Sequence, residues 1–267
     1  MKKILVAGGA GFLGFHLCKR LLDKKHHVVC VDNFFSGSKD NIQSLLKDKH
    51  FEFIFHDVVD PFVIEVDDIY NLACAASPKI YQKDPRKTMK TSFLGSLNLL
   101  ELASKNSASY FFASSSEVYG DAEINPQPES YWGKVNPIGR RACYDEGKRI
   151  GECLAVEFKK DINVNIKIGR IFNTYGPKMH IDDGRVVSNF IWQALTNKPI
   201  TVYGDGSQTR SFCFVDDTVL GIEKLMNSES GFSGPVNLGN DNEISVKTLA
   251  ELVINMDDWV KIRNKVL

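Results

Sequence analysis

Ile4-Leu5-Val6-Ala7 runs directly into Gly8-Gly9-Ala10-Gly11-Phe12-Leu13-Gly14, so four apolar residues precede a glycine-rich turn. Such an unbroken apolar run is typical of a parallel strand that is buried on both faces. Leucines at 17, 21 and 22 then follow with helical spacing. Glycines between a strand and a helix allow a tight turn and let the backbone approach a pyrophosphate at the helix N-terminus. The segment therefore predicts a dinucleotide site lined by Gly8, Gly11, Phe12, Leu13 and Gly14.

A second apolar run, residues 28–31, ends at Asp32, which lies 18 residues beyond Gly14. A carboxylate at this point suits a ribose 2′-hydroxyl and repels a 2′-phosphate, so we predict NAD rather than NADP. The alternative is an aspartate that only shapes a turn. Asp57, after a third strand at 51–55, could reach the adenine amino group or cap the strand end. Other side chains expected along the cofactor are Asn33, Phe35, Ser36, Gly37, Val58, Leu72 and Ala73.

Strands and helices alternate along the rest of the first 170 residues. Further strands are predicted at 69–73, 110–113 and 164–168, and long helices at 86–105 and 139–160. Beyond them we expect helices at 186–195 and 216–226 and short strands at 201–203 and 236–239. This order predicts an α/β fold, a Rossmann-type doubly wound parallel sheet with a smaller, partly truncated C-terminal substrate-binding lobe. The NAD-binding domain is placed at 1–170 and the interleaved lobe at 171–267.

Tyr144 and Lys148 are four residues apart in the predicted helix 139–160, so both side chains should lie on one face. A tyrosine hydroxyl normally titrates near ~10, and a neighbouring ammonium is expected to lower that pKa. The pair could then take a proton from a sugar alcohol. A Tyr-x-x-x-Lys match alone arises roughly once by chance in a chain of this composition, so its surroundings decide. Ser114-Ser115-Ser116-Glu117 follows the strand at 110–113, at the sheet edge where ligands bind in open α/β sheets.

Charge and cysteine content exclude several classes of protein. The 267-residue chain has 33 Lys plus Arg against 33 Asp plus Glu, which gives no electrostatic footprint for nucleic acid or for an anionic membrane. No apolar run is long enough to span a bilayer. The six cysteines show no Cys-x-x-Cys spacing and are interpreted as reduced core thiols of a cytoplasmic protein, without a metal site.

Longer motifs carry a family resemblance from residue 2 to about residue 250. They lie at 75–78 with Tyr81, 87–91, 115–121, 131–133, 135–139, 143–149, 170–177, 183–190, 201–204 and 208–210. On these segments the chain resembles the extended short-chain dehydrogenase/reductases that act on nucleotide sugars. Within that family it is most similar to the enzymes that decarboxylate UDP-glucuronate.

The resemblance implies a reaction without net redox change that turns UDP-glucuronate into UDP-xylose. Tyr144 would take the proton of the C4 hydroxyl while C4 gives hydride to NAD. The C5 carboxylate is β to the resulting ketone and leaves as carbon dioxide, after which C5 is protonated and C4 is reduced again. Ser115 would bind the C4 oxygen, Glu117 would assist at C5, and Lys148 would tune Tyr144 and hold the nicotinamide ribose.

The resemblance also assigns binding positions. At cofactor positions lie Thr91, Thr174, His180 and Arg185. At substrate positions lie Tyr81, Lys90, Asn98, Asn173, Thr201, Tyr203, Gln208 and Arg210, the last because a guanidinium fork matches a diphosphate. Asn98 could equally be an amide that packs on the sheet. The family normally continues further, with an arginine that holds the uronate carboxylate, and Arg263 lacks that context. Asn71 and Ser92 stand where the family usually has His and Asn.

Three alternatives remain open. A 4,6-dehydratase needs an Asp-Glu pair where this chain has Ser116-Glu117, and a 4-epimerase needs no glutamate at 117. A nucleotide-sugar-binding protein without turnover would also explain a shortened C-terminal part. The helices at 86–105 and 139–160 are expected to form a homodimer through a four-helix bundle, as in relatives.

Overall fold

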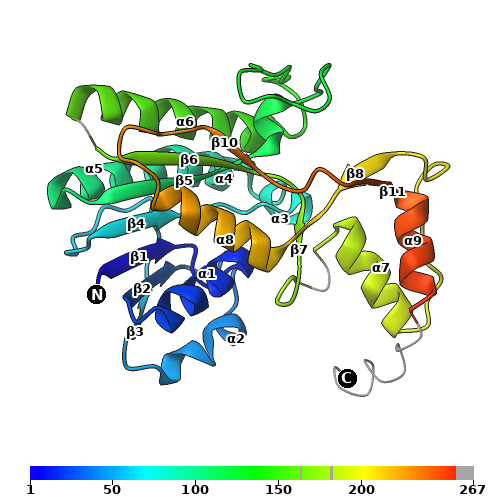
Figure 1. The fold of residues 1–267 in the computed structure, drawn as a ribbon, viewed down its shortest axis with the longest axis horizontal. Helices are drawn as coiled ribbons and strands as arrows, with labels where there is room; N and C mark the ends of the chain where they lie inside the picture. Colours follow the sequence, from blue (N-terminus) through cyan, green and yellow to red (C-terminus); the bar gives the residue numbers. More distant parts are fainter. Residues whose placement is uncertain (163, 181–182, 257–267) are drawn as a thin grey trace.

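The computed structural model describes residues 1–162, 164–180 and 183–256. In this part of the chain seven strands form one parallel sheet in the order β10-β6-β5-β4-β1-β2-β3, which confirms the doubly wound prediction (Figure 1). The strands are β1 (Lys3–Ala7), β2 (His27–Asp32), β3 (Phe51–Phe55), β4 (Asp68–Asn71), β5 (Ser109–Ser115), β6 (Ile166–Ile171) and β10 (Val236–Leu238).

Helices cover both faces of the sheet, because strand side chains alternate between two apolar clusters. Ile4 and Val6 of β1 pack toward α1 (Phe12–Asp23) and α8 (Val215–Met226). Leu5 and Ala7 pack on the opposite face, toward α5 (Ser96–Asn106) and α6 (Ala142–Ile162). Figure 1 shows these two helical layers on either side of the strands. The continuous apolar strands of the sequence are thus explained by burial on both faces.

The helix predicted at 86–105 is interrupted. It consists of α4 (Pro85–Lys90), a π-helical segment at Thr91–Gly95, and α5. The remaining short helices before α6 are α2 (Lys39–Ile42), α3 (Pro78–Tyr81) and 3-10 turns at Leu45–Lys47 and Ser116–Tyr119. The predicted helix at 139–160 begins only at Ala142, because a turn at Gly139 precedes it. The cysteines are all free, but Cys153 is exposed on α6, so the prediction of core thiols was wrong there.

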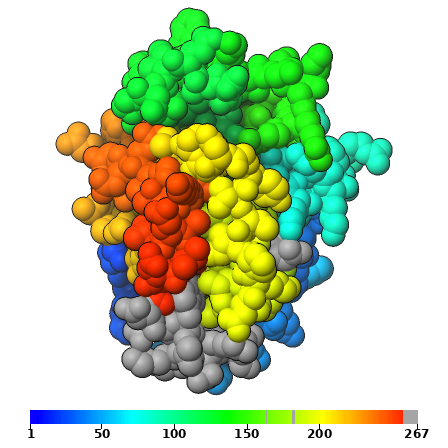
Figure 2. Space-filling model, turned by 90° about the vertical axis from the view of Figure 1, so that its right-hand side faces the viewer, coloured from blue at the N-terminus to red at the C-terminus, as the bar shows by residue number. Residues whose placement is uncertain are grey.

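The C-terminal part forms a second, smaller core. Helices α7 (Val186–Leu195) and α9 (Val246–Ile254) pack on each other beside an antiparallel pair, β8 (Thr209–Ser211) and β11 (Glu243–Ser245). Figure 2 shows α7 and α9 side by side on this face. A parallel pair, β7 (Thr174–Tyr175) and β9 (Cys213–Phe214), links this core to the main sheet. The strand predicted at 201–203 is absent, since that segment has no regular structure and the strand lies at β8.

After β9 the chain returns to the main sheet. Helix α8 packs against α1 and β10 pairs with β6, so residues beyond 170 contribute to both cores. The boundary placed at residue 170 stays a prediction. Arg263 lies outside the described residues. Among the residues that are described, no helix combines the length and apolarity needed to cross a bilayer.

Candidate active site

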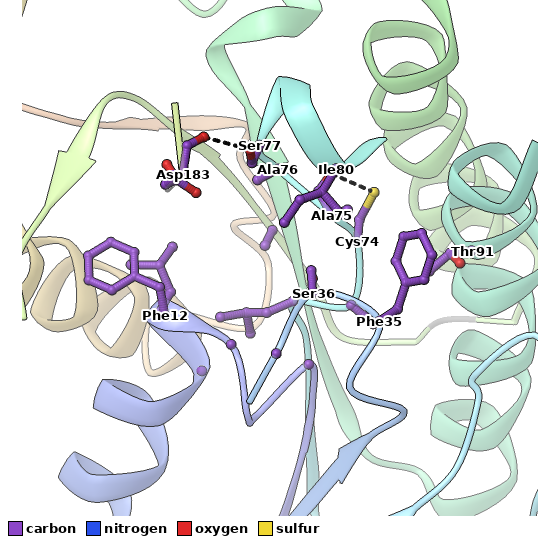
Figure 3. Close-up of a pocket in the computed structure, with 18 of the residues that line it drawn as sticks. Phe12, Phe35, Ser36, Cys74, Ala75, Ala76, Ser77, Ile80, Thr91 and Asp183 are labelled. Atoms are coloured by element: carbon purple, nitrogen blue, oxygen red, sulfur yellow. Dashed lines mark hydrogen bonds between the residues drawn. The ribbon is translucent and has the colours of Figure 1, made fainter. Parts of the chain in front are cut away.

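A cavity of ≈ 1210 Å³ opens at the carboxyl ends of the strands. Its lining comes from the glycine turn after β1, the loops after β2, β3, β4 and β5, the first turns of α6, and residues 171–174, 178–180, 183 and 185. Figure 3 shows Phe12, Phe35 and Cys74 around it, with the Ser77 hydroxyl donating to the Asp183 carbonyl at 2.7 Å. Pockets for small ligands typically measure about 300–1,000 Å³, so this cavity is larger than one drug-sized molecule requires.

The glycine turn can only be built from glycines. Gly8 has a φ of +79°, and a Cβ there would lie 2.7 Å from the Leu72 carbonyl oxygen. A Cβ on Gly14 would lie 2.1 Å from the Gly8 carbonyl oxygen. Gly11 caps α1 without a side-chain hydrogen bond, so the first N–H groups of that helix face the cavity beside Phe12. This is the arrangement that binds a pyrophosphate.

Asp32 ties β2 to the glycine turn. Its carboxylate accepts from the Ala10 N–H at 3.0 Å and from the Phe34 N–H at 2.8 Å, and it also lines the cavity. Burial raises the pKa of Asp32, and the backbone donors oppose that rise. The residue therefore shapes the turn and faces the predicted ribose site at once.

Asp57 caps the end of β3, as one of its two predicted roles required. Its carboxylate accepts from the Val59 N–H at 3.1 Å and the Asn33 amide at 2.9 Å, and it forms an ion pair with Lys87. Burial acts to raise the pKa of Asp57, but Lys87 and the other donors outweigh it and hold the pKa below its ordinary value. Asp57 also lines the cavity, so contact with an adenine stays a prediction.

Tyr144 and Lys148 lie together on the buried face of α6. The Lys148 ammonium is 5.6 Å from the centre of the Tyr144 ring and donates to the Ala113 carbonyl at 2.7 Å. Ser115, at the end of β5, lies within hydrogen-bonding reach of the Tyr144 hydroxyl. All three side chains line the cavity, and Tyr81 stacks on Tyr144 with ring centres 4.9 Å apart.

The ionisation of Tyr144 differs from the prediction. Burial raises the pKa of Tyr144 above its ordinary value, and Cys74 and Glu117 add to the rise. Ser115 and Arg185 lower it, but they do not compensate. Burial also lowers the pKa of Lys148. The predicted lowering of the Tyr144 pKa was therefore wrong, because removing the phenolate from water raises this pKa by more than the neighbouring groups lower it.

Glu117 forms an ion pair with Arg141, and both side chains line the cavity. The Arg141 Nε also donates to the Tyr81 hydroxyl at 3.1 Å. Arg141 was not among the predicted site residues. It immediately precedes α6, and its sequence signal is weak because its partners, Glu117 and Tyr81, are distant in sequence.

The other predicted cofactor residues also line the cavity. They are Asn33, Phe35, Ser36, Gly37, Leu13, Val58, Leu72, Ala73, Thr91, Thr174, His180 and Arg185. Among the predicted substrate residues, Asn173 lines it as well, and Tyr81 is buried behind Tyr144. Lining side chains that were missed include Lys79, Lys83, Lys178 and Asp183.

The remaining predicted substrate residues do not line this cavity. Asn98 donates to the Val58 carbonyl at 2.9 Å, which favours its packing alternative. Lys90 is exposed at the end of α4. Thr201, Tyr203, Gln208 and Arg210 lie around β8 in the C-terminal part, where Tyr203 is 83% exposed. No group of three or more metal-ligating side chains is found within the described ranges.

Comparisons with known proteins agree with this geometry. Residues 4–239 match the model of the NAD dependent epimerase/dehydratase family. Over 94% of its length the chain is 53% identical to UDP-glucuronic acid decarboxylase 5 of Arabidopsis thaliana and 54% identical to UDP-glucuronic acid decarboxylase 1 of Xenopus tropicalis. It spans 73% of the first relative and 59% of the second.

Solved structures show the same fold at lower identity. The UDP-glucuronic acid 4-epimerase of Bacillus cereus, in complex with NAD, superposes with a TM-score of 0.82 at 30% identity, over 92% of this chain and 80% of that one. UDP-glucose 4-epimerase of Thermotoga maritima, with UDP-glucose, gives 0.83 at 26% identity, over 96% and 83%.

Proposed function

Because the chain belongs to the NAD dependent epimerase/dehydratase family, we propose that it decarboxylates UDP-glucuronate to UDP-xylose with bound NAD and without net redox change. One observation carries the proposal. Ser115, Glu117, Tyr144 and Lys148 meet at one cavity in a chain that is 53–54% identical to several proteins named UDP-glucuronic acid decarboxylases.

The cavity fits NAD by its shape and its donors. A Cβ at Gly8 or Gly14 would collide with backbone, so both positions require glycine. Because no side chain projects from them, the N-terminus of α1 is open to a pyrophosphate. The Asp32 carboxylate lies where a ribose hydroxyl could donate to it, and Lys148 lies where the nicotinamide ribose is expected. Bound NAD would take a hydride from the sugar C4 and return it after carbon dioxide has left.

Tyr144 would act as the general base on the C4 hydroxyl. Its raised pKa keeps the hydroxyl protonated, so it could take the C4 proton only if the positive charge of a bound nicotinamide beside it favoured the phenolate; Ser115 would donate to the C4 oxygen. Once C4 is a ketone, it accepts the electron pair of the C5–C6 bond and carbon dioxide leaves. Glu117 is the carboxyl group beside Tyr144 that could then protonate C5.

The structural likeness to a UDP-glucuronic acid 4-epimerase makes epimerisation the second candidate, because that structure contains UDP-glucuronic acid, the substrate proposed here. Epimerisation keeps the carboxylate, whereas decarboxylation removes it. Incubation with UDP-glucuronate and NAD should release carbon dioxide and give a nucleotide pentose by mass spectrometry, without accumulation of NADH. A product of unchanged mass that differs from UDP-glucuronate by NMR would establish the epimerase, and bound but unchanged substrate a binding protein. A dehydratase needs a C6 hydroxyl, so it is tested separately with UDP-glucose, which it would convert to a 4-keto-6-deoxy sugar.

The quaternary structure and the location belong to the same proposal. Exposed apolar side chains on α4, the π-helical segment and α6 support a homodimer through these helices; they include Met89, Phe93, Leu94, Ile150 and Val156. The cysteines of the described residues are unpaired, which fits a reducing cytoplasm. Sedimentation of the purified protein tests the dimer.

A further inference from the structure

Glu117 and Arg141 form an ion pair inside the cavity, where another carboxylate could take the place of Glu117. Both side chains line the space, and 33% of the Glu117 side chain and 47% of the Arg141 side chain are exposed. Ion pairs with this much exposure contribute little to stability. A ligand carboxylate could therefore replace Glu117 as the partner of Arg141 at small cost.

The guanidinium is held in place on its other side. Its Nε donates to the Tyr81 hydroxyl at 3.1 Å, and the Tyr81 ring stacks on Tyr144 with an angle of 9° between the planes. An arginine fork has five N–H donors, so the contact with Tyr81 leaves further donors for carboxylates. The position of Arg141 is thus fixed relative to the proposed base.

Carboxyl groups surround this arginine. Asp145 is buried next to Tyr144, and its Oδ1 has no hydrogen-bond partner. It interacts electrostatically with Glu117, Arg141 and Glu146. Another carboxylate brought close to Glu117 and Asp145 would be repelled unless a cation stood beside it. Arg141 is a cation lining the cavity that already contacts Glu117.

Resting on the function proposed above, we propose that Arg141 binds the carboxylate of the uronate and passes between it and Glu117 during the reaction. With substrate bound, Glu117 loses its cation, faces a second carboxylate and takes up a proton. The C5–C6 bond then breaks, its electron pair moves to the C4 carbonyl as an enolate, and carbon dioxide leaves. Arg141 returns to Glu117, which gives its proton to C5 as the enolate reverts to the ketone.

The test compares two ligands that differ in the carboxylate. In a Tyr144→Phe background, which blocks turnover, Kd values for UDP-glucuronate and UDP-xylose are measured by calorimetry with NAD present. Arg141→Met should weaken UDP-glucuronate roughly 10- to 100-fold, the loss of a charge-assisted hydrogen bond, and UDP-xylose less than about threefold. Arg140→Met is the matched control, because Arg140 is exposed and does not line the cavity; both Kd values should stay unchanged.

Glu117→Gln gives the opposite sign. Removing the competing carboxylate should tighten UDP-glucuronate by roughly three- to tenfold and leave UDP-xylose unchanged, a gain that a structural role for the pair would not produce. The proposal is overturned if Arg141→Met weakens both ligands equally, or if Glu117→Gln fails to tighten UDP-glucuronate; the second arm decides if Arg141→Met does not fold. Carbon dioxide release by the wild type is measured separately. If no carbon dioxide is released, the proposed reaction is wrong, but the binding measurements still test whether Arg141 binds the carboxylate.

Discussion

Tyr144 is buried in a site that opposes its ionisation, and this sets its behaviour as a base. Phenylalanine would keep the stacking on Tyr81 and the packing of α6 but has no phenolic oxygen to accept a proton. We expect Tyr144→Phe to lower kcat by about a hundred- to ten-thousand-fold, the contribution of a general base, while NAD still binds. Steady-state product assays and NAD titration measure the two effects. Tyr131→Phe, outside the cavity, is the control, and normal turnover by Tyr144→Phe would refute the base.

Asp145 should make the stability of the protein depend on pH. Burial, and then Glu117, raise the pKa of Asp145 to about 6, above the ordinary value of 3.8. The native state therefore holds this proton where the unfolded chain has lost it, so the contribution to stability falls as pH rises from 3.8 to about 6. Asparagine has the same shape and cannot ionise.

Asp145→Asn should thus match the wild type near pH ~4 and be more stable by about 1–2 kcal/mol above pH ~7, a difference reduced by solvent and Arg141. Urea unfolding at a series of pH values measures it. Asp161→Asn, at the exposed end of the same helix, should show no such trend. A wild-type advantage that grows with pH would contradict the raised pKa.

Residues that satisfy a local backbone constraint were easier to predict than residues whose role depends on contacts with distant parts of the chain. Gly8 and Asp32 could be predicted because a tight turn and a strand end restrict which residue fits there. Both line the cavity. Arg141 was missed, since its role depends on Glu117 and Tyr81, which are distant in sequence. Tyr203 and Arg210 were assigned to the substrate site by resemblance alone. In the structure they lie on the C-terminal part and do not line the cavity.

Elements buried on both faces were predictable, and elements defined by tertiary contacts were not. The strands β1, β2 and β5 appear in the sequence as apolar runs because helices cover both of their sides. The π-helical segment at Thr91–Gly95 could not be read from periodicity, because it continues the helical pattern. The strand expected at 201–203 failed because three residues of high β-propensity form no strand without a partner, and the partner β11 pairs with β8.

Two helix glycines make a matched pair at this scale. A Cβ on Gly151 of α6 would lie 2.2 Å from Cζ of the buried Phe112, whereas one on Gly221 of α8 would lie 3.2 Å from the flexible tip of Leu238. Alanine gains about 1 kcal/mol in a helix, and overpacking costs about 1–3 kcal/mol. Gly151→Ala should therefore lower the free energy of unfolding by up to about 2 kcal/mol, and Gly221→Ala should change it by about 0 to +1 kcal/mol. Urea titration would contradict the packing if the order were reversed.

At the scale of the whole molecule, α6 presents two different faces. Its inner face carries Tyr144 and Lys148, and its outer face exposes Ile150 and Val156 beside Phe93 of the π-helical segment. Apolar side chains gathered on neighbouring helices are typical of an interface. A dimer built there would bury the back of the helix that holds the proposed base, and would restrain its movement.

Phe93→Glu tests this interface. Phe93 is 40% exposed, so a glutamate there is tolerated by the monomer, but burying its carboxylate between two apolar surfaces would cost several kcal/mol without a partner. Sedimentation at micromolar concentration should give a dimer for the wild type and a monomer for Phe93→Glu. Phe55→Glu makes the same change on the edge strand β3, where the side chain is 68% exposed, and should stay dimeric. A monomeric wild type would rule out the dimer, and a dimeric Phe93→Glu would move the interface to another surface of the molecule.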